Sequence, residues 1–115
     1  MEELDVNNYL IRENLFDFFK VQLKKDFDSC SLNTDFIDHL PSQFELLKDS
    51  LLIELKPLLK SNSLLSNLLY RIDINEIQIK NYQLKNSTIN FEEVLAELII
   101  KRILQKVILK KKFSQ

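Results

Sequence analysis

The chain has 115 residues, of which 45% are hydrophobic and 29% are charged, and its formal net charge is −1. This length predicts one domain spanning residues 1–115, and this apolar content excludes a disordered polypeptide. Glycine is absent. Its absence excludes the standard Walker phosphate loop, the dinucleotide-binding fingerprint and the nucleophile elbow, because each of these motifs requires glycine.

The sequence also bears on location. No stretch approaches 18 uncharged apolar residues, so we expect no transmembrane segment. The acidic start, from Met1 to Asp5, lacks the basic residues and apolar run of a signal peptide. The single cysteine excludes an internal disulfide and fits a reducing compartment. We therefore expect a cytoplasmic protein.

The first predicted helix runs from about Val6 to Phe27. Its apolar residues recur at steps of three and four on two neighbouring stripes, which is typical of a helix with a wide apolar face. The polar segment 28–34 then predicts a loop. A short turn is expected from Thr34 to Ile37.

Pro41 is expected to force the preceding residue out of the helical region. Ser42, followed three residues later by Glu45, has the spacing of a capping box and predicts the start of a second long helix. Pro57 should kink or end that helix, because proline removes a backbone hydrogen bond and clashes with the preceding turn.

The polar segment 61–63 predicts a break, followed by a helix from Leu64 to Ile72. Asp73 and Glu76 have the spacing of a second capping box, which predicts a further helix from Ile74 to about Leu84. The alternation within 71–79 also fits a half-buried strand. Helix is favoured, because a lone hairpin would need more partner strands than this chain offers.

Asn90 and Glu93 have the spacing of a third capping box, at the start of a long helix that ends near Lys112. Valine, leucine and isoleucine occupy more than one side of this helix. Such a helix is either buried in the middle of a bundle or shared with another chain. Together the elements predict an all-α fold, a compact bundle of four to five helices with short loops.

Few residues offer catalytic or metal-binding chemistry. Cys30 and His39 are the only thiol and imidazole, and no glycine-rich oxyanion loop accompanies them. A zinc site needs about four such ligands. Three pairs of carboxylates are each explained by a structural role at a helix end or cap. These pairs are Asp26 with Asp28, Asp35 with Asp38, and Glu92 with Glu93. We predict no enzyme, no cofactor and no metal site.

Charge is unevenly distributed. Residues 1–57 hold 6 Lys/Arg and 12 Asp/Glu, whereas residues 58–115 hold 10 and 5. The cations of the last helix are Lys101, Arg102, Lys106, Lys110, Lys111 and Lys112. Cations suit a helix C-terminus, and the acidic half can face the basic half within one chain or across a dimer. Nucleic-acid contact by this helix and contact of Lys110–Phe113 with an anionic membrane surface are the alternatives.

The surplus of apolar side chains bears most directly on function. Adjacent pairs such as Leu51-Leu52 and Ile99-Ile100 cannot all turn inward on single-faced helices. This indicates an association face, although a dense bundle around a fully buried helix explains the same pattern. We expect a non-enzymatic protein that works through helix-mediated association, with a homodimer as the simplest partner or another protein in its place. A nucleic-acid-binding regulator is the alternative, and a small enzyme with a carboxylate cleft is a third hypothesis.

The last helix is the expected interface. The residues assigned to it are Leu98, Ile99, Ile103, Lys106, Val107 and Lys110. Lys106 and Lys110 are expected to pair with acidic residues. Ile103→Glu is expected to abolish assembly.

Overall fold

The computed structural model of the chain describes residues 3–11 and 15–113. All regular elements in these residues are helical, which confirms the all-α prediction. In chain order they are α1 (Glu3–Ile11), α2 (Phe16–Ser29), the 3-10 helix η1 (Asp35–His39), α3 (Phe44–Leu55), the 3-10 helix η2 (Pro57–Lys60), α4 (Asn62–Ile72), α5 (Glu76–Lys85) and α6 (Phe91–Phe113). No helix in the described ranges is long and apolar enough to cross a membrane.

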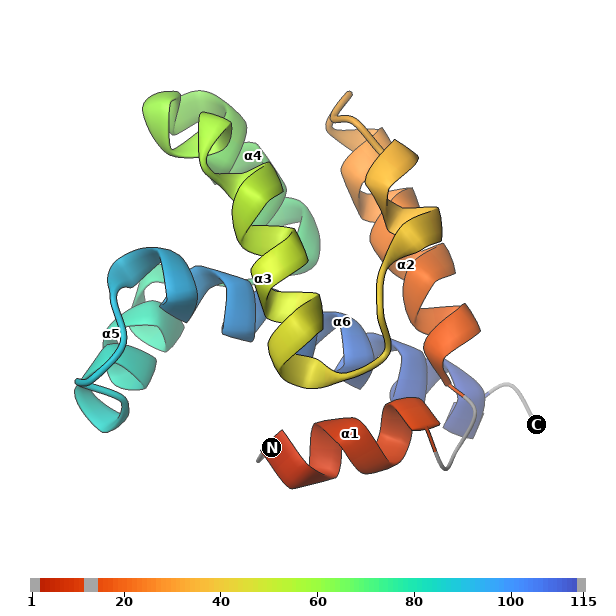
Figure 1. Ribbon diagram of the computed structural model, residues 1–115. Coiled ribbons are helices and arrows are strands. Elements are labelled where there is room, and N and C mark those ends of the chain that lie inside the picture. Colours follow the sequence, from red (N-terminus) through yellow and green to blue (C-terminus); the bar gives the residue numbers. More distant parts are fainter. Residues whose placement is uncertain (1–2, 12–14, 114–115) are drawn as a thin grey trace.

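The last helix, α6, lies at the centre of the bundle. It packs against α2, α3, α4 and α5, and it runs behind α3 in Figure 1. Its residues Val94, Leu95, Ala96, Ile99, Ile100, Ile103 and Leu104 have no exposed surface. The apolar pattern on several sides of this helix is therefore accounted for by burial within its own chain.

The prediction of one helix over 6–27 is wrong, because α1 and α2 are separate helices that run in different directions (Figure 1). Val6 and Leu10 of α1 are buried in the same core as Phe19 of α2. The side-chain oxygen of Asn7 also accepts a 2.9 Å hydrogen bond from the backbone N–H of Phe44. Because α1 runs in a different direction from α2, it packs against the start of α3. A helix continuous with α2 would not make this contact.

The two prolines act as predicted. Leu40, before Pro41, is extended with φ −68° and ψ 137°. The helix α3 ends at Leu55, and Pro57 begins the 3-10 helix η2. Proline restricts the residue before it and cannot donate within a helix, so both boundaries follow from local sequence.

Two of the predicted N-terminal caps can be compared directly. The cap of α3 is Gln43 rather than Ser42, because the Gln43 side-chain oxygen accepts a 3.0 Å hydrogen bond from the backbone N–H of Leu46. The start of α6 is as predicted, since the backbone N–H of Glu93 donates to the side-chain oxygen of Asn90 over 2.9 Å.

The segment 71–80 is helical apart from a short connection, so the strand alternative is wrong. Asp73 does not cap α5; it ends α4 in the left-handed region, at φ 75° and ψ 54°. Asn75 and Gln78 form the capping box of α5 instead, with side chain to backbone hydrogen bonds of 2.9 and 2.7 Å. Asp73 tolerates positive φ better than most residues that have a Cβ, which explains why α4 can turn here without glycine.

Candidate functional site

The residues predicted to form an interface lie on α6, and three of them belong to the core of a single chain. Ile99 and Ile103 have no exposed surface, and Val107 is 4% exposed. Leu98 is partly buried and packs against the same core. A second chain would have to displace part of this core to reach Ile99 or Ile103. An association role for these residues stays a prediction, whereas their packing role is observed.

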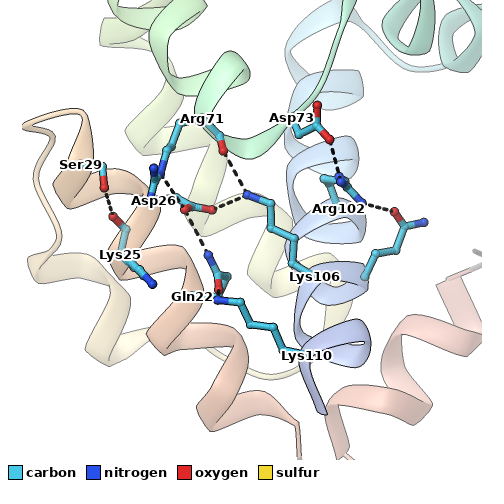
Figure 2. Close-up of polar contacts among 10 residues, drawn as sticks. Gln22, Lys25, Asp26, Ser29, Arg71, Asp73, Arg102, Lys106 and Lys110 are labelled. Atoms are coloured by element: carbon cyan, nitrogen blue, oxygen red, sulfur yellow. Dashed lines mark hydrogen bonds and ion pairs between the residues drawn. The ribbon is translucent and has the colours of Figure 1, made fainter. Parts of the chain in front are cut away.

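Lys106 and Lys110 reach a buried polar cluster centred on Asp26 of α2 (Figure 2). The Asp26 carboxylate accepts hydrogen bonds from Gln22 Nε2 at 3.1 Å, Arg71 Nε at 3.3 Å and Lys106 Nζ at 3.0 Å. Lys106 also donates to the backbone oxygen of Arg71 over 3.1 Å. Lys110 donates to Gln22 Oε1 over 2.5 Å.

This Asp26 cluster joins three helices that are distant in sequence. Asp26 lies on α2, Arg71 on α4 and Lys106 on α6. Lys106 pairs with an acidic residue of its own chain, whereas the partner of Lys110 is an amide. Pairing of these lysines with acidic residues across an interface stays a prediction. A buried carboxylate is stable only when it is paired and hydrogen-bonded, so the cluster has a structural role in fixing the packing of these helices.

A second polar cluster surrounds Lys48 of α3. Its ammonium lies 3.1 Å from Glu45, 3.1 Å from Glu97 and 3.5 Å from Glu93. Burial by itself lowers the pKa of Lys48, but hydrogen bonds to Glu97 and Glu45, and the charges of these carboxylates, outweigh burial and raise that pKa above its ordinary value. Lys48 therefore stays charged and holds α3 against the start of α6.

Tyr82 extends the Lys48 cluster to α5. Its hydroxyl donates to Glu97 Oε1 over 2.5 Å, and Lys101 Nζ donates to the same hydroxyl over 2.8 Å. The Lys101 ammonium also lies 4.8 Å from the centre of the Tyr82 ring. These contacts attach α5 to α6 through polar groups.

The candidate chemical residues do not assemble into a reactive site in the described ranges. Cys30 is partly buried, and burial raises its pKa, with the Arg71 charge opposing and the Asp26 charge adding to this shift. A raised pKa leaves little reactive thiolate at neutral pH. His39 is exposed at the end of η1, and no hydrogen bond joins it to Cys30 in the described residues. Those residues also contain no group of three His, Cys, Asp or Glu side chains that could hold a metal ion.

The three carboxylate pairs lie in different environments. Asp26 is buried while Asp28 is exposed, so this pair faces two environments. Asp35 and Asp38 are exposed on η1. Glu92 and Glu93 are partly buried in the first turn of α6, where a negative charge suits the helix N-terminus.

Most cations of α6 are engaged within the chain. Four of them donate to groups of other helices or connections, and these are Lys101, Arg102, Lys106 and Lys110. Arg102, for example, makes a 2.8 Å ion pair with Asp73. This helix therefore presents less available positive charge than its sequence indicates.

Among the described residues, exposed large apolar side chains occur on several helices, and the three most exposed of them lie on α4 and α5. Within the described residues, no side chain of α5 is buried, and its Ile77 and Leu84 are 69% and 81% exposed. Tyr70 of α4 is 87% exposed. An open groove of about 580 Å³ separates the two helices, and its apolar lining consists of Leu69, Tyr70, Ile74, Ile79 and Phe91. We call this groove, together with Ile77 and Leu84, the α4–α5 surface.

The sequence by itself does not single out the α4–α5 surface, because its strongest apolar signal lies on α6. One signal was present: Ile77 and Leu84 are seven residues apart, the spacing of one helical face, in a helix that is otherwise largely polar. Comparison of the chain with protein-family models, with curated proteins and with solved structures gives no match. The chain's own geometry is thus the basis for any functional inference.

Proposed function

We propose that the protein is a non-enzymatic cytoplasmic module that associates with another protein chain through the α4–α5 surface. The observation that carries this proposal is the exposure of Ile77 and Leu84 on α5, a helix whose described residues include no buried side chain. Together with the apolar lining of the groove between α4 and α5, these side chains make up the kind of exposed apolar surface that commonly marks an interaction site.

The energetics of α5 support the same proposal. An isolated helix of 10 residues is marginal in water. The contacts that hold α5 in place are the polar groups around Tyr82 and the partly buried Ile79. Covering Ile77 and Leu84 would gain roughly 25 cal/mol for each Å² of apolar surface removed from water. Association would therefore stabilise α5, none of whose described side chains is buried.

We place the association surface on α4 and α5 rather than on α6. Ile99 and Ile103 are already covered by their own chain. The alternative of nucleic-acid binding is weakened because Arg102 and Lys106 of α6 form ion pairs with Asp73 and Asp26 within the chain, which leaves the exposed Lys110, Lys111 and Lys112 as its main basic group.

Site-specific photo-cross-linking in cells that naturally express the chain tests this function. A photoreactive residue at position 84 should give a covalent protein adduct, and Ile77→Asp in the same chain should abolish it. The matched control is a photoreactive residue at Val21, which is 66% exposed on α2, away from α5 (Figure 1). Adducts that form equally at both positions, or at neither, would contradict the proposal.

A further inference from the structure

We propose that the partner of the α4–α5 surface is a second copy of this chain, with the two α5 helices packed antiparallel about a two-fold axis. This inference rests on the proposed function and names its partner. Closed two-fold dimers are the commonest soluble oligomers, and each uses one self-complementary surface twice. The argument therefore depends on whether α5 complements itself.

The outer residues of α5 are chemically symmetric about the point midway between Lys80 and Asn81, whereas this central pair is not, because Lys80 is charged and Asn81 is neutral. Equal steps outward from this point reach Gln78 and Gln83, then Ile77 and Leu84. The next step reaches Glu76 on one side and Lys85 on the other. In an antiparallel pair, a two-fold axis through this midpoint sets each of these glutamines level with a glutamine of the other copy. It likewise sets Ile77 level with Leu84, and Glu76 level with Lys85.

The symmetric apolar residues lie on one exposed face. Ile77, Lys80, Asn81 and Leu84 are spaced at i, i+3, i+4 and i+7, which places them along one side of a helix. All four are exposed. In an antiparallel pair, Ile77 of each copy packs against Leu84 of the other, so the axis produces the same apolar contact twice.

Charge also favours the antiparallel arrangement over a parallel one. The N-terminal end of α5 carries Glu76 and its C-terminal end carries Lys85. Antiparallel packing sets each acidic end beside a basic end and opposes the two helix dipoles, whereas parallel packing sets like ends together. The antiparallel orientation therefore suits the apolar contacts and the charges of the two helix ends, and the one unfavourable contact that it makes is between Lys80 and its own copy beside the axis.

The rest of the α4–α5 surface supplies the remaining contact area. A helix of 10 residues is only about 15 Å long, and a stable interface buries at least about 1,200 Å². The exposed Tyr70 and the groove residues Leu69 and Phe91 flank α5. They would be covered by the second copy, and the expected dissociation constant is micromolar, as suits a small interface.

Disulfide trapping tests the geometry, in a Cys30→Ser chain that removes the native thiol. In an antiparallel pair, the two copies of residue 81 lie about 1.5 Å apart along the helix direction, whereas those of residue 85 lie about 13 Å apart. A disulfide needs Cα atoms within about 7 Å. Asn81→Cys should therefore form a linked dimer under mild oxidation, and Lys85→Cys should remain monomeric.

A mixture of two variants fixes the orientation. Ile77→Cys chains should link to Leu84→Cys chains, while neither should link to itself, because the two copies of either residue lie about 10 Å apart along the helices. Parallel packing would give the opposite pattern. Either self-linking of both variants or a failure of Asn81→Cys to link would overturn the inference.

Light scattering after size exclusion of the unmodified chain, with absorbance at 260 nm, completes the test. A dimer free of nucleic acid is expected at about 100 μM, well above a micromolar dissociation constant. A monomer at that concentration would overturn the homodimer. The proposed function would survive that result if the photo-adduct at position 84 contained a different protein, and it would fail if no adduct formed.

Discussion

Lys106 of α6 donates a 3.0 Å hydrogen bond to the carboxylate of Asp26 on α2, across a separation of 80 residues. Asp26 is 1% exposed, and Arg71 of α4 contacts its other oxygen (Figure 2). One buried carboxylate thereby links three helices. This contact joins an acidic residue of the first half of the chain to basic residues of the second half.

Asp26→Asn should destabilise the chain by about 2 kcal/mol, because Arg71 and Lys106 lose a charged acceptor in a site that excludes water. Urea denaturation measures this difference. Asp28→Asn is the matched control, since Asp28 is exposed two residues away, and it should change the free energy of unfolding by less than about 0.5 kcal/mol. Equal effects of the two substitutions would contradict the structural role of the Asp26 cluster.

Lys48 should make stability fall with alkaline pH. Burial lowers its pKa, but Glu97 and Glu45 outweigh burial, so its folded-state pKa is raised above that of the unfolded chain. The stabilisation it provides is fully present below the ordinary lysine pKa of about 10.4. It is lost as pH rises through the higher folded-state pKa, because the unfolded chain gives up this proton first.

The comparison of Lys48→Met with Lys56→Met isolates this effect from the other lysines. Lys56 is exposed, so Lys56→Met should keep the full alkaline decrease in the free energy of unfolding. Lys48→Met should be less stable at neutral pH and show a shallower decrease above pH about 10. Parallel pH profiles for the two variants would be inconsistent with the raised pKa.

Ile103→Glu should unfold the chain rather than separate folded subunits. Ile103 has no exposed surface within one chain, and burying an unpaired carboxylate there should cost more than about 4 kcal/mol. Circular dichroism measures the loss of helix. Ile103→Val should remain folded at a cost of about 1 kcal/mol. A helical, folded Ile103→Glu chain would mean that this residue faces an exchangeable surface.

Tyr82→Phe should loosen α5 without unfolding the core. The lost hydroxyl joins Glu97 to Lys101, and its removal should cost about 1 kcal/mol. Amides of α5 should then exchange with solvent several-fold faster, while those of α6 stay protected. Tyr9→Phe, on α1 and outside the α4–α5 surface, is the control and should leave the exchange of α5 unchanged. Uniform acceleration across all helices would contradict a local role.

Lys80→Leu should strengthen the proposed dimer. Lys80 lies half a residue step from the two-fold midpoint, so the axis brings two like charges close together. Replacing both with leucine removes this repulsion and adds apolar contact, which should lower the dissociation constant about tenfold. Sedimentation equilibrium measures the constant, and Lys24→Leu, at an exposed site on α2, should leave it unchanged. Weaker association of Lys80→Leu would contradict the two-fold geometry.

Local sequence predicted most elements of this protein, but it did not reveal that α1 and α2 are separate helices. The apolar period predicted helices, proline set the boundaries at Leu40 and Leu55, and the spacing of Asn90 and Glu93 marked the start of α6. These features depend on residues within one or two turns of each other. Helix caps were less predictable where polar residues cluster. Gln43 caps α3 where Ser42 was expected, and Asn75 caps α5 where Asp73 was expected.

Tertiary structure decided what each side chain faces. The sequence shows that Ile99, Ile103 and Val107 are apolar residues of one helix. Only the packing shows that four neighbouring helices cover α6. The joining of Asp26 to Lys106, and the exposure of Ile77 and Leu84, likewise depend on how helices distant in sequence are placed. An apolar side chain has the same hydrophobicity in a core or at an interface, so the sequence determined which residues must leave water, and the fold decided which of them its own chain could bury.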